Sequence, residues 1–200
     1  MDDSAEGARH VSNDEKSTGI LLREMGMAMA PNNGYTAIVN LLNQARQAQA
    51  AGLTIPALAM VYVGIDTMAW LSLPVGQEKQ GRQDFYRWVD TYLKTDANQP
   101  YQYVGRDLYA ARCAVLHQFS TIAELHRQTN PPKKFGYLDN GPHRADGGDL
   151  VLISVAMLVR DYCHAVGRFM QAARADADLK ARIDSRVLEL LNTTPISYAV

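Results

Sequence analysis

The stretch from Leu53 to Leu73, LTIPALAMVYVGIDTMAWLSL, constrains the fold most, because as a helix it is apolar on every face. Such a helix needs either a protein core or a lipid bilayer around it, and this stretch is long enough for both. However, it contains Asp66, and an acid near the centre of a membrane span costs about 2.5–3.5 kcal/mol on insertion scales. We therefore expect a buried core helix, no membrane partner, and further helices packed around it.

The remaining chain supplies those helices, because apolar residues recur at helical spacing between breaks made by glycine and proline. The 200 residues, 47% of them hydrophobic, suit one core. We expect an all-α bundle of four to six helices in a single domain over 19–195, after a disordered tail over 1–18 that has little to bury. Besides the apolar stretch, the expected helices cover residues 19–30, 35–51, 82–94, 106–127, 150–173 and 176–191.

Residues 128–149, QTNPPKKFGYLDNGPHRADGGD, form the longest segment with no helical pattern. Its prolines and glycines favour turns, and its apolar residues allow a small strand pair within it. Segments of this length are often functional. Lys133, Lys134 and Arg144 lie here and are the local basic residues that could bind a phosphate-bearing substrate.

Composition excludes several functions. The formal net charge of −1 gives no overall attraction to nucleic acid, so RNA binding needs a local basic patch. Cys113 and Cys163 lie in apolar helical segments and are expected to be reduced core residues. The polar, acidic N-terminus does not resemble a signal peptide, and we expect a cytoplasmic protein. No metal-ligand spacing or phosphate-binding loop is present, so we expect neither a metal nor a cofactor.

Two charges stand out because their surroundings are apolar. On the helix expected over 106–127, Arg112 falls within the stripe that contains Leu108 and Val115. Asp66 is the only charge in the long apolar helix, and an unpaired buried charge is very costly. We therefore expect Asp66 and Arg112 to meet across the bundle, either as a structural ion pair or at a common ligand.

His117 follows Arg112 by five residues, which separates the two by about 140° on an ideal helix. We therefore expect the two side chains to flank a groove that a second subunit completes. They are not expected to converge in one pocket. Elsewhere, His143 is expected to be exposed, and Arg160, Asp161 and His164 are expected to form a network on the surface of a helix.

The segment DLYAARCAVLH, residues 107–117, carries the spacing Arg-x4-His, and RWVDTYL lies upstream at 87–93. Together they resemble the HEPN-like superfamily, over roughly residues 35–173. The resemblance implies a bundle of four to five helices, often dimeric, with two motifs facing a shared cleft. Many members are metal-independent endoribonucleases, several of them toxins or antiviral effectors, and others are non-catalytic.

The resemblance also implies roles. His117 would be the acid and base, because histidine titrates near neutrality. Arg112 would clamp phosphate oxygens with its planar fork, and Asp66 would orient one of the two. The toxin branch often has a tyrosine two residues after the histidine, as a target for nucleotide transfer. Phe119 stands there in this chain, which excludes that regulation.

Two functions follow as hypotheses. The first is a metal-independent endoribonuclease, acting as a homodimer in a defence or toxin setting. The alternative is a non-catalytic helical module that binds RNA, a nucleotide or a protein partner, with Arg112 paired structurally to Asp66.

Overall fold

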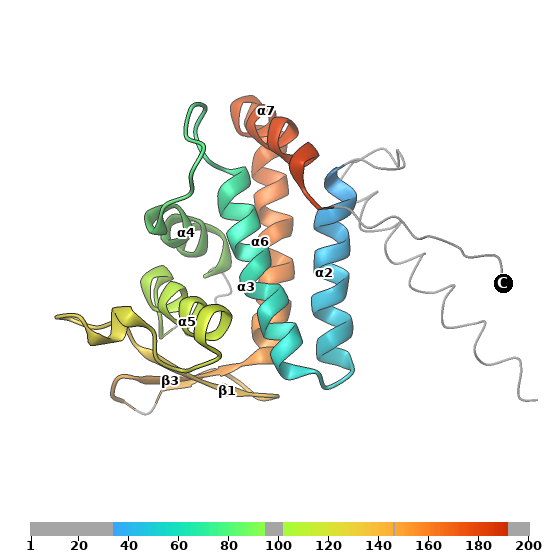
Figure 1. The fold of residues 1–200 in the computed structure, drawn as a ribbon. Coiled ribbons are helices and arrows are strands. Elements are labelled where there is room, and N and C mark those ends of the chain that lie inside the picture. Colours follow the sequence, from blue (N-terminus) through green and yellow to red (C-terminus); the bar gives the residue numbers. More distant parts are fainter. Residues whose placement is uncertain (1–33, 95–101, 146, 192–200) are drawn as a thin grey trace, which may run out of the picture.

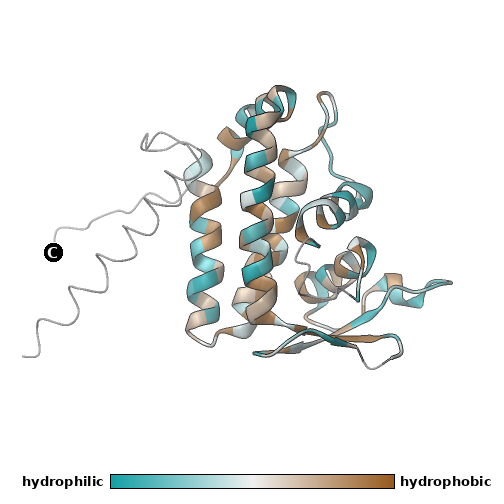
Figure 2. Ribbon diagram, turned by 180° about the vertical axis from the view of Figure 1, so that it is seen from behind, coloured by the Kyte–Doolittle hydropathy of each residue, from teal (hydrophilic) through white to brown (hydrophobic). Residues whose placement is uncertain are grey.

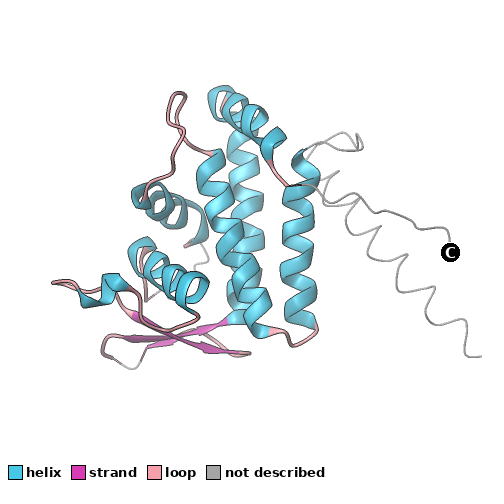
Figure 3. Cartoon of the chain, viewed as in Figure 1, coloured by secondary structure: helices cyan, strands magenta, loops and turns pink. Residues whose placement is uncertain are grey.

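The computed structural model of the protein describes residues 34–94, 102–145 and 147–191. The expected tail over 1–18 and the expected helix over 19–30 lie outside these residues. Most of the described chain is helical (Figure 3). In chain order its α-helices are α2 (Gly34–Ala50), α3 (Thr54–Leu71), α4 (Arg82–Trp88), α5 (Gly105–Gln118), α6 (Val155–Ala175) and α7 (Ala177–Arg186). The shorter helical segments are the π-helix η1 (Val89–Leu93) and the 3-10 helices η2 (Glu124–Arg127) and η3 (Val187–Glu189).

Helix α3 runs through the middle of this arrangement and packs against α2, α4, α5, α6 and α7 (Figure 1). Half of its residues are buried inside the protein. Among the described helices it alone is long and apolar enough to cross a membrane. The sequence therefore predicts the bounds of this helix to within two residues and its many helical neighbours correctly.

Helices α2, α3 and α6 stand side by side, α4 and α5 lie against one side of them, and α7 crosses one end (Figure 1). One cluster of buried apolar residues extends from Ile38 on α2 to Val187 in η3. Within it Phe169 of α6 packs edge-on against the rings of Trp88 and Tyr92. Hydrophilic and hydrophobic residues are interleaved along α6 (Figure 2), as expected of a helix with one face in the core.

A small three-stranded sheet closes the other end of the helices, so the predicted all-α class with one possible strand pair is incomplete in this respect. Strands β1 (Lys134–Leu138) and β2 (Arg144–Ala145) lie on either side of β3 (Leu150–Ser154). β1 pairs with β3 in parallel, and β2 pairs with β3 in the antiparallel direction. Both strands allowed within 128–149 are therefore present, but each pairs with β3 beyond that segment and not with the other.

Strand β3 occupies the first five residues of the helix expected over 150–173. A short apolar run such as LVLIS suits a buried strand or a buried helix equally well, so periodicity alone does not decide between them. The helix begins only after Ser154, whose side chain accepts a hydrogen bond from the Met157 backbone N–H.

Helix α5 also ends earlier than predicted, at Gln118 and not at residue 127. Phe119 adopts the left-handed conformation, with φ 47° and ψ 47°. The backbone N–H groups of Phe119 and Ser120 donate to the carbonyls of Val115 and Ala114, at 3.2 and 3.0 Å. Glycine or asparagine usually occupies this helix-ending position, so a phenylalanine gives no stop signal in the sequence.

Candidate functional site

Helices α3 and α5 bring Asp66 and Arg112 together, as their apolar surroundings predict. Arg112 Nε lies 2.6 Å from Asp66 Oδ2, and Arg112 Nη2 lies 2.5 Å from the same oxygen. The two side chains are 19% and 22% exposed, respectively. The pair therefore sits at the edge of the core, where a ligand can still reach it.

His117 extends this pair into a chain of three groups, which we call the Asp66–Arg112–His117 cluster. Arg112 Nη1 lies 2.8 Å from His117 Nε2. Because a guanidinium has only donors, Nε2 must accept this hydrogen bond, and the neutral imidazole then carries its proton on Nδ1. The imidazole itself is exposed.

The expectation that Arg112 and His117 diverge is wrong. A helical wheel treats each side chain as a radial spoke, whereas a long arginine side chain also runs along the helix surface. His117 lies in the last turn of α5, next to the chain reversal at Phe119. The two functional groups can therefore meet within one subunit, and the cluster is formed without a second copy of the chain.

Further contacts hold the cluster in place. Gln80 Nε2 donates to Asp66 Oδ1 at 3.4 Å, so both carboxylate oxygens of Asp66 have partners. The Tyr109 ring lies under the Arg112 guanidinium, with Cζ 5.9 Å from the ring centroid. Cys113 Sγ lies 3.9 Å from Arg112 Nη1. The guanidinium is thus confined on several sides.

The electrostatics of the pair reflect its position between core and solvent. Burial raises the pKa of Asp66 above its ordinary value, and the charge and hydrogen bonds of Arg112 act against this rise. Burial lowers the pKa of Arg112, but Asp66 and Cys113 together outweigh this effect and the pKa is raised. Arg112 therefore remains a cation at every pH at which the protein is used.

The start of α5 is fixed to its neighbours, and this fixes Arg112 and His117. The Asp107 carboxylate accepts hydrogen bonds from the backbone N–H groups of Val104 and Lys133, both at 2.9 Å. A Cβ on Gly105 would lie 2.6 Å from the Tyr86 Cα, so only glycine permits this close approach of α5 to α4. These contacts tie α5 both to α4 and to the chain entering β1.

The three expected basic residues do not join the cluster. Lys133 donates its Nζ to the Gln102 carbonyl. Lys134 and Arg144 are exposed, on β1 and β2, which flank opposite sides of β3. Within the described part of the chain, no hydrogen bond or ion pair links any of the three to Arg112 or His117. They are dispersed across the sheet that packs against α5.

His143 and Asp161 are buried, with 5% and 1% exposure, so the expectation that both lie on the surface is wrong. The Ser154 backbone N–H donates to His143 Nδ1 at 3.0 Å, and His143 Nε2 lies 3.8 Å from Asp161 Oδ2. Arg160 does pair with Asp161, at 2.7 Å, and His164 is exposed as expected. The turn between β1 and β2 covers α6 here, and local sequence patterns contain no sign of that contact.

Among residues 34–94, 102–145 and 147–191, no group of three histidine, cysteine, aspartate or glutamate side chains is placed to hold a metal ion. Comparison of the chain with protein-family models, with curated proteins and with solved structures finds no match. The functional assignment therefore depends on the chemistry of the Asp66–Arg112–His117 cluster.

Proposed function

We propose that this chain is a HEPN-like, metal-independent endoribonuclease that acts in the cytoplasm in a defence or toxin setting. The contact between Arg112 Nη1 and His117 Nε2, at 2.8 Å, is the observation that carries the proposal. It joins an exposed imidazole nitrogen that can accept a proton to a cation that can bind phosphate. A proton acceptor and a cation that stabilises phosphate charge are groups that RNA cleavage without a metal can use.

The reaction begins when a phosphate oxygen of the RNA binds the guanidinium of Arg112 and draws Nη1 away from His117. The freed Nε2 accepts the proton of the 2′-hydroxyl, and the 2′-oxygen attacks the adjacent phosphorus. The bond from phosphorus to the 5′-oxygen breaks, and that oxygen leaves with a proton from the imidazolium. The products are a 2′,3′-cyclic phosphate and a 5′-hydroxyl end. Arg112 stabilises the negative charge that develops on the phosphate oxygens in the transition state.

Asp66 acts in this proposal as a positioning residue. Its Oδ2 holds Nε and Nη2 of Arg112, so that the opposite side of the guanidinium faces His117. A planar guanidinium held along one edge presents its remaining N–H bonds in a fixed direction, which favours binding of a phosphate.

A second function is favoured by the same geometry. Asp66 and His117 together occupy three of the five N–H bonds of Arg112, and an arginine so engaged can be purely structural. In that case the chain is a non-catalytic helical module that binds RNA, a nucleotide or a protein partner. Both proposals retain the expected homodimer.

The decisive experiment is cleavage of single-stranded RNA by the purified full chain in EDTA. We expect cyclic phosphate products, a loss of about 10²–10⁴-fold for His117→Ala, and a loss of about 10²–10³-fold for Arg112→Ala. Asp66→Asn should reduce the rate less, because it only loosens Arg112. His164→Ala is the matched control, since it removes an exposed histidine from α6, and it should cleave like the unaltered chain.

Thermal unfolding of each variant separates the two functions. Cleavage that persists in both His117→Ala and Arg112→Ala contradicts the proposed catalytic roles. An inactive unaltered chain together with a strongly destabilised Arg112→Ala variant supports the non-catalytic module.

A further inference from the structure

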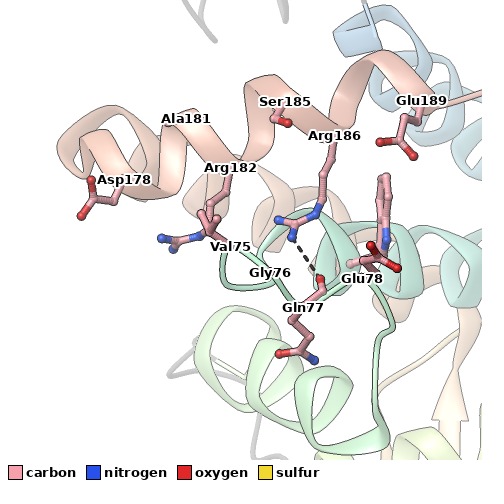
Figure 4. Close-up of a pocket in the computed structure, with 11 residues that line it drawn as sticks. Val75, Gly76, Gln77, Glu78, Asp178, Ala181, Arg182, Ser185, Arg186 and Glu189 are labelled. Atoms are coloured by element: carbon pink, nitrogen blue, oxygen red, sulfur yellow. Dashed lines mark hydrogen bonds between the residues drawn. The ribbon is translucent and has the colours of Figure 1, made fainter.

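A cavity of about 850 Å³ lies between α7 and the loop that joins α3 to α4 (Figure 4). Its volume falls within the range of about 300–1,000 Å³ that is typical of pockets for small ligands. None of Asp66, Arg112 and His117 lines it, so it is separate from the candidate ribonuclease site.

The wall of this cavity is held in place by Arg186. Its Nη1 donates to the Leu73 carbonyl at 2.6 Å, and its Nη2 donates to the carbonyls of Pro74 and Gln77 at 2.9 and 3.2 Å. Its Cζ also lies 6.0 Å from the centroid of the Trp70 ring. The loop is thus bonded to α7 at three points, and the cavity is already formed without a ligand.

Arg182, one turn before Arg186, lies in the same wall and lacks a hydrogen-bond partner within the described residues. Its Nε is buried and has no hydrogen-bond partner in the described structure. The guanidinium as a whole lines the cavity, and within the described residues no hydrogen bond or ion pair engages it. Asp178 also lines the cavity, but no ion pair joins it to Arg182 among the described residues. A carboxylate from a ligand in the cavity could bind the terminal nitrogens of Arg182, which are not among the buried atoms.

The other end of the cavity carries two acids. Figure 4 shows Glu78 and Glu189 there, away from Asp178 and Arg182. Both glutamates are exposed, and a cation placed between them would also approach the indole of Trp70, which lines the cavity. With three acids and two arginines around it, the cavity suits a ligand of both charges better than a simple anion.

We propose that this cavity binds a short peptide that is a zwitterion, with a carboxylate at Arg182 and an ammonium group between Glu78 and Glu189. An apolar side chain of the peptide covers Val75, which is 89% exposed on the loop. The cavity volume of about 850 Å³ exceeds the volume of a single amino acid. This binding site is independent of the proposed ribonuclease function.

Tryptophan fluorescence provides the test, because the chain has only two tryptophans and Trp88 is 2% exposed. In the full-length Trp88→Phe variant, Trp70 alone reports ligand binding at the cavity. The probes are alanyl-leucyl-alanine, its N-acetylated form, its C-terminal amide and free leucine. We expect saturable binding of the free tripeptide and at least tenfold weaker binding of the other three. Calorimetry on the unaltered chain checks that Trp88→Phe has not changed the site.

Charge variants test the assigned contacts. Arg182→Gln should weaken binding of the free tripeptide at least tenfold. Glu189→Gln, at an exposed position, should weaken binding of the tripeptide and leave binding of the N-acetylated form unchanged. Lys180→Gln is the matched control, because Lys180 pairs with Asp184 on α7 and does not line the cavity.

Four results would overturn the proposal. They are no saturable binding, equal affinity for the charged and blocked tripeptides, equal affinity for leucine and the tripeptide, and unchanged tripeptide affinity in both Arg182→Gln and Glu189→Gln.

Discussion

The thiol of Cys163 lies on α6 in surroundings that keep it protonated. Burial raises its pKa to about 11, and the nearby Arg46 acts against this rise. Only the thiolate is a good nucleophile, so about one molecule in a thousand is reactive at pH 8. Because burial disfavours the thiolate, the folded state loses stability as the pH rises from the pKa of the unfolded thiol through about 11.

We therefore predict slow alkylation of Cys163 in a Cys113→Ala variant, in which it is the only cysteine. The rate with iodoacetamide, followed by mass spectrometry, should rise about tenfold per pH unit between pH 8 and pH 10. The same variant in urea should react quickly at pH 8, because the unfolded thiol has its ordinary pKa. Equally fast reaction of the folded protein at pH 8 would contradict the assigned burial.

Single residues differ in how far the sequence predicts their contacts. Asp66 and Arg112 could be paired because each is a charge among apolar neighbours and has few ways to be satisfied. The burial of His143 and Asp161 could not be predicted, because it depends on a turn of the sheet that folds over α6 from elsewhere in the chain. The contact between Arg112 and His117 could not be predicted either, because helix geometry fixes the direction of Cβ but not the path of a long side chain.

At the scale of elements, the boundaries were harder to predict than the helices themselves. The amphipathic helix α2 lies within one residue of its expected bounds, whereas α7 ends at Arg186 and not at residue 191. The larger errors fall at β3, where a short apolar run suits a strand or a helix equally well, and at the end of α5, where no glycine marks the stop. Both errors lie near the candidate site, since α5 carries its motif and packs against β1.

The end of α5 supplies a prediction about stability. Phe119 adopts the left-handed conformation although its side chain is 76% exposed, so little burial offsets a backbone cost of about 1–2 kcal/mol. Phe119→Gly should therefore stabilise the protein by about 0.5–1 kcal/mol, after the greater freedom of glycine in the unfolded chain is counted. Urea unfolding measures the change.

Phe119→Ala is the control for that substitution, because alanine loses the ring and keeps the backbone cost. Its stability should stay close to that of the unaltered chain. If glycine and alanine destabilise the protein equally, the ring and not the backbone determines the stability of this helix end.

At the scale of the whole molecule, α3 connects the two sites. Asp66 contributes to the cluster with Arg112, and Trp70, one turn further along, lines the cavity beneath α7. Residues four apart lie on the same face of a helix. The opposite side of α3 rests on α6, so the packing of these two helices supports both sites at once.

Gly64 is the tightest point of that packing. A Cβ at this position would lie 2.0 Å from the Tyr162 hydroxyl, and Tyr162 is fully buried. Alanine gains about 1 kcal/mol over glycine within a helix, whereas overpacking a core costs about 1–3 kcal/mol. Because the added methyl group would overlap the Tyr162 hydroxyl, the clash should outweigh the helix preference of alanine. We therefore predict that Gly64→Ala destabilises the protein by about 1–2 kcal/mol and lowers Tm by several degrees.

Gly167 on α6 provides the matched substitution, because a Cβ there would meet no atom within 4 Å. Gly167→Ala should gain the helix preference without a clash, and it should raise Tm in the same thermal unfolding experiment. Opposite signs for the two glycines would support the close contact between α3 and α6. If Gly64→Ala raises Tm as Gly167→Ala does, α3 must stand further from α6, and the placement of Asp66 and Trp70 would have to be revised with it.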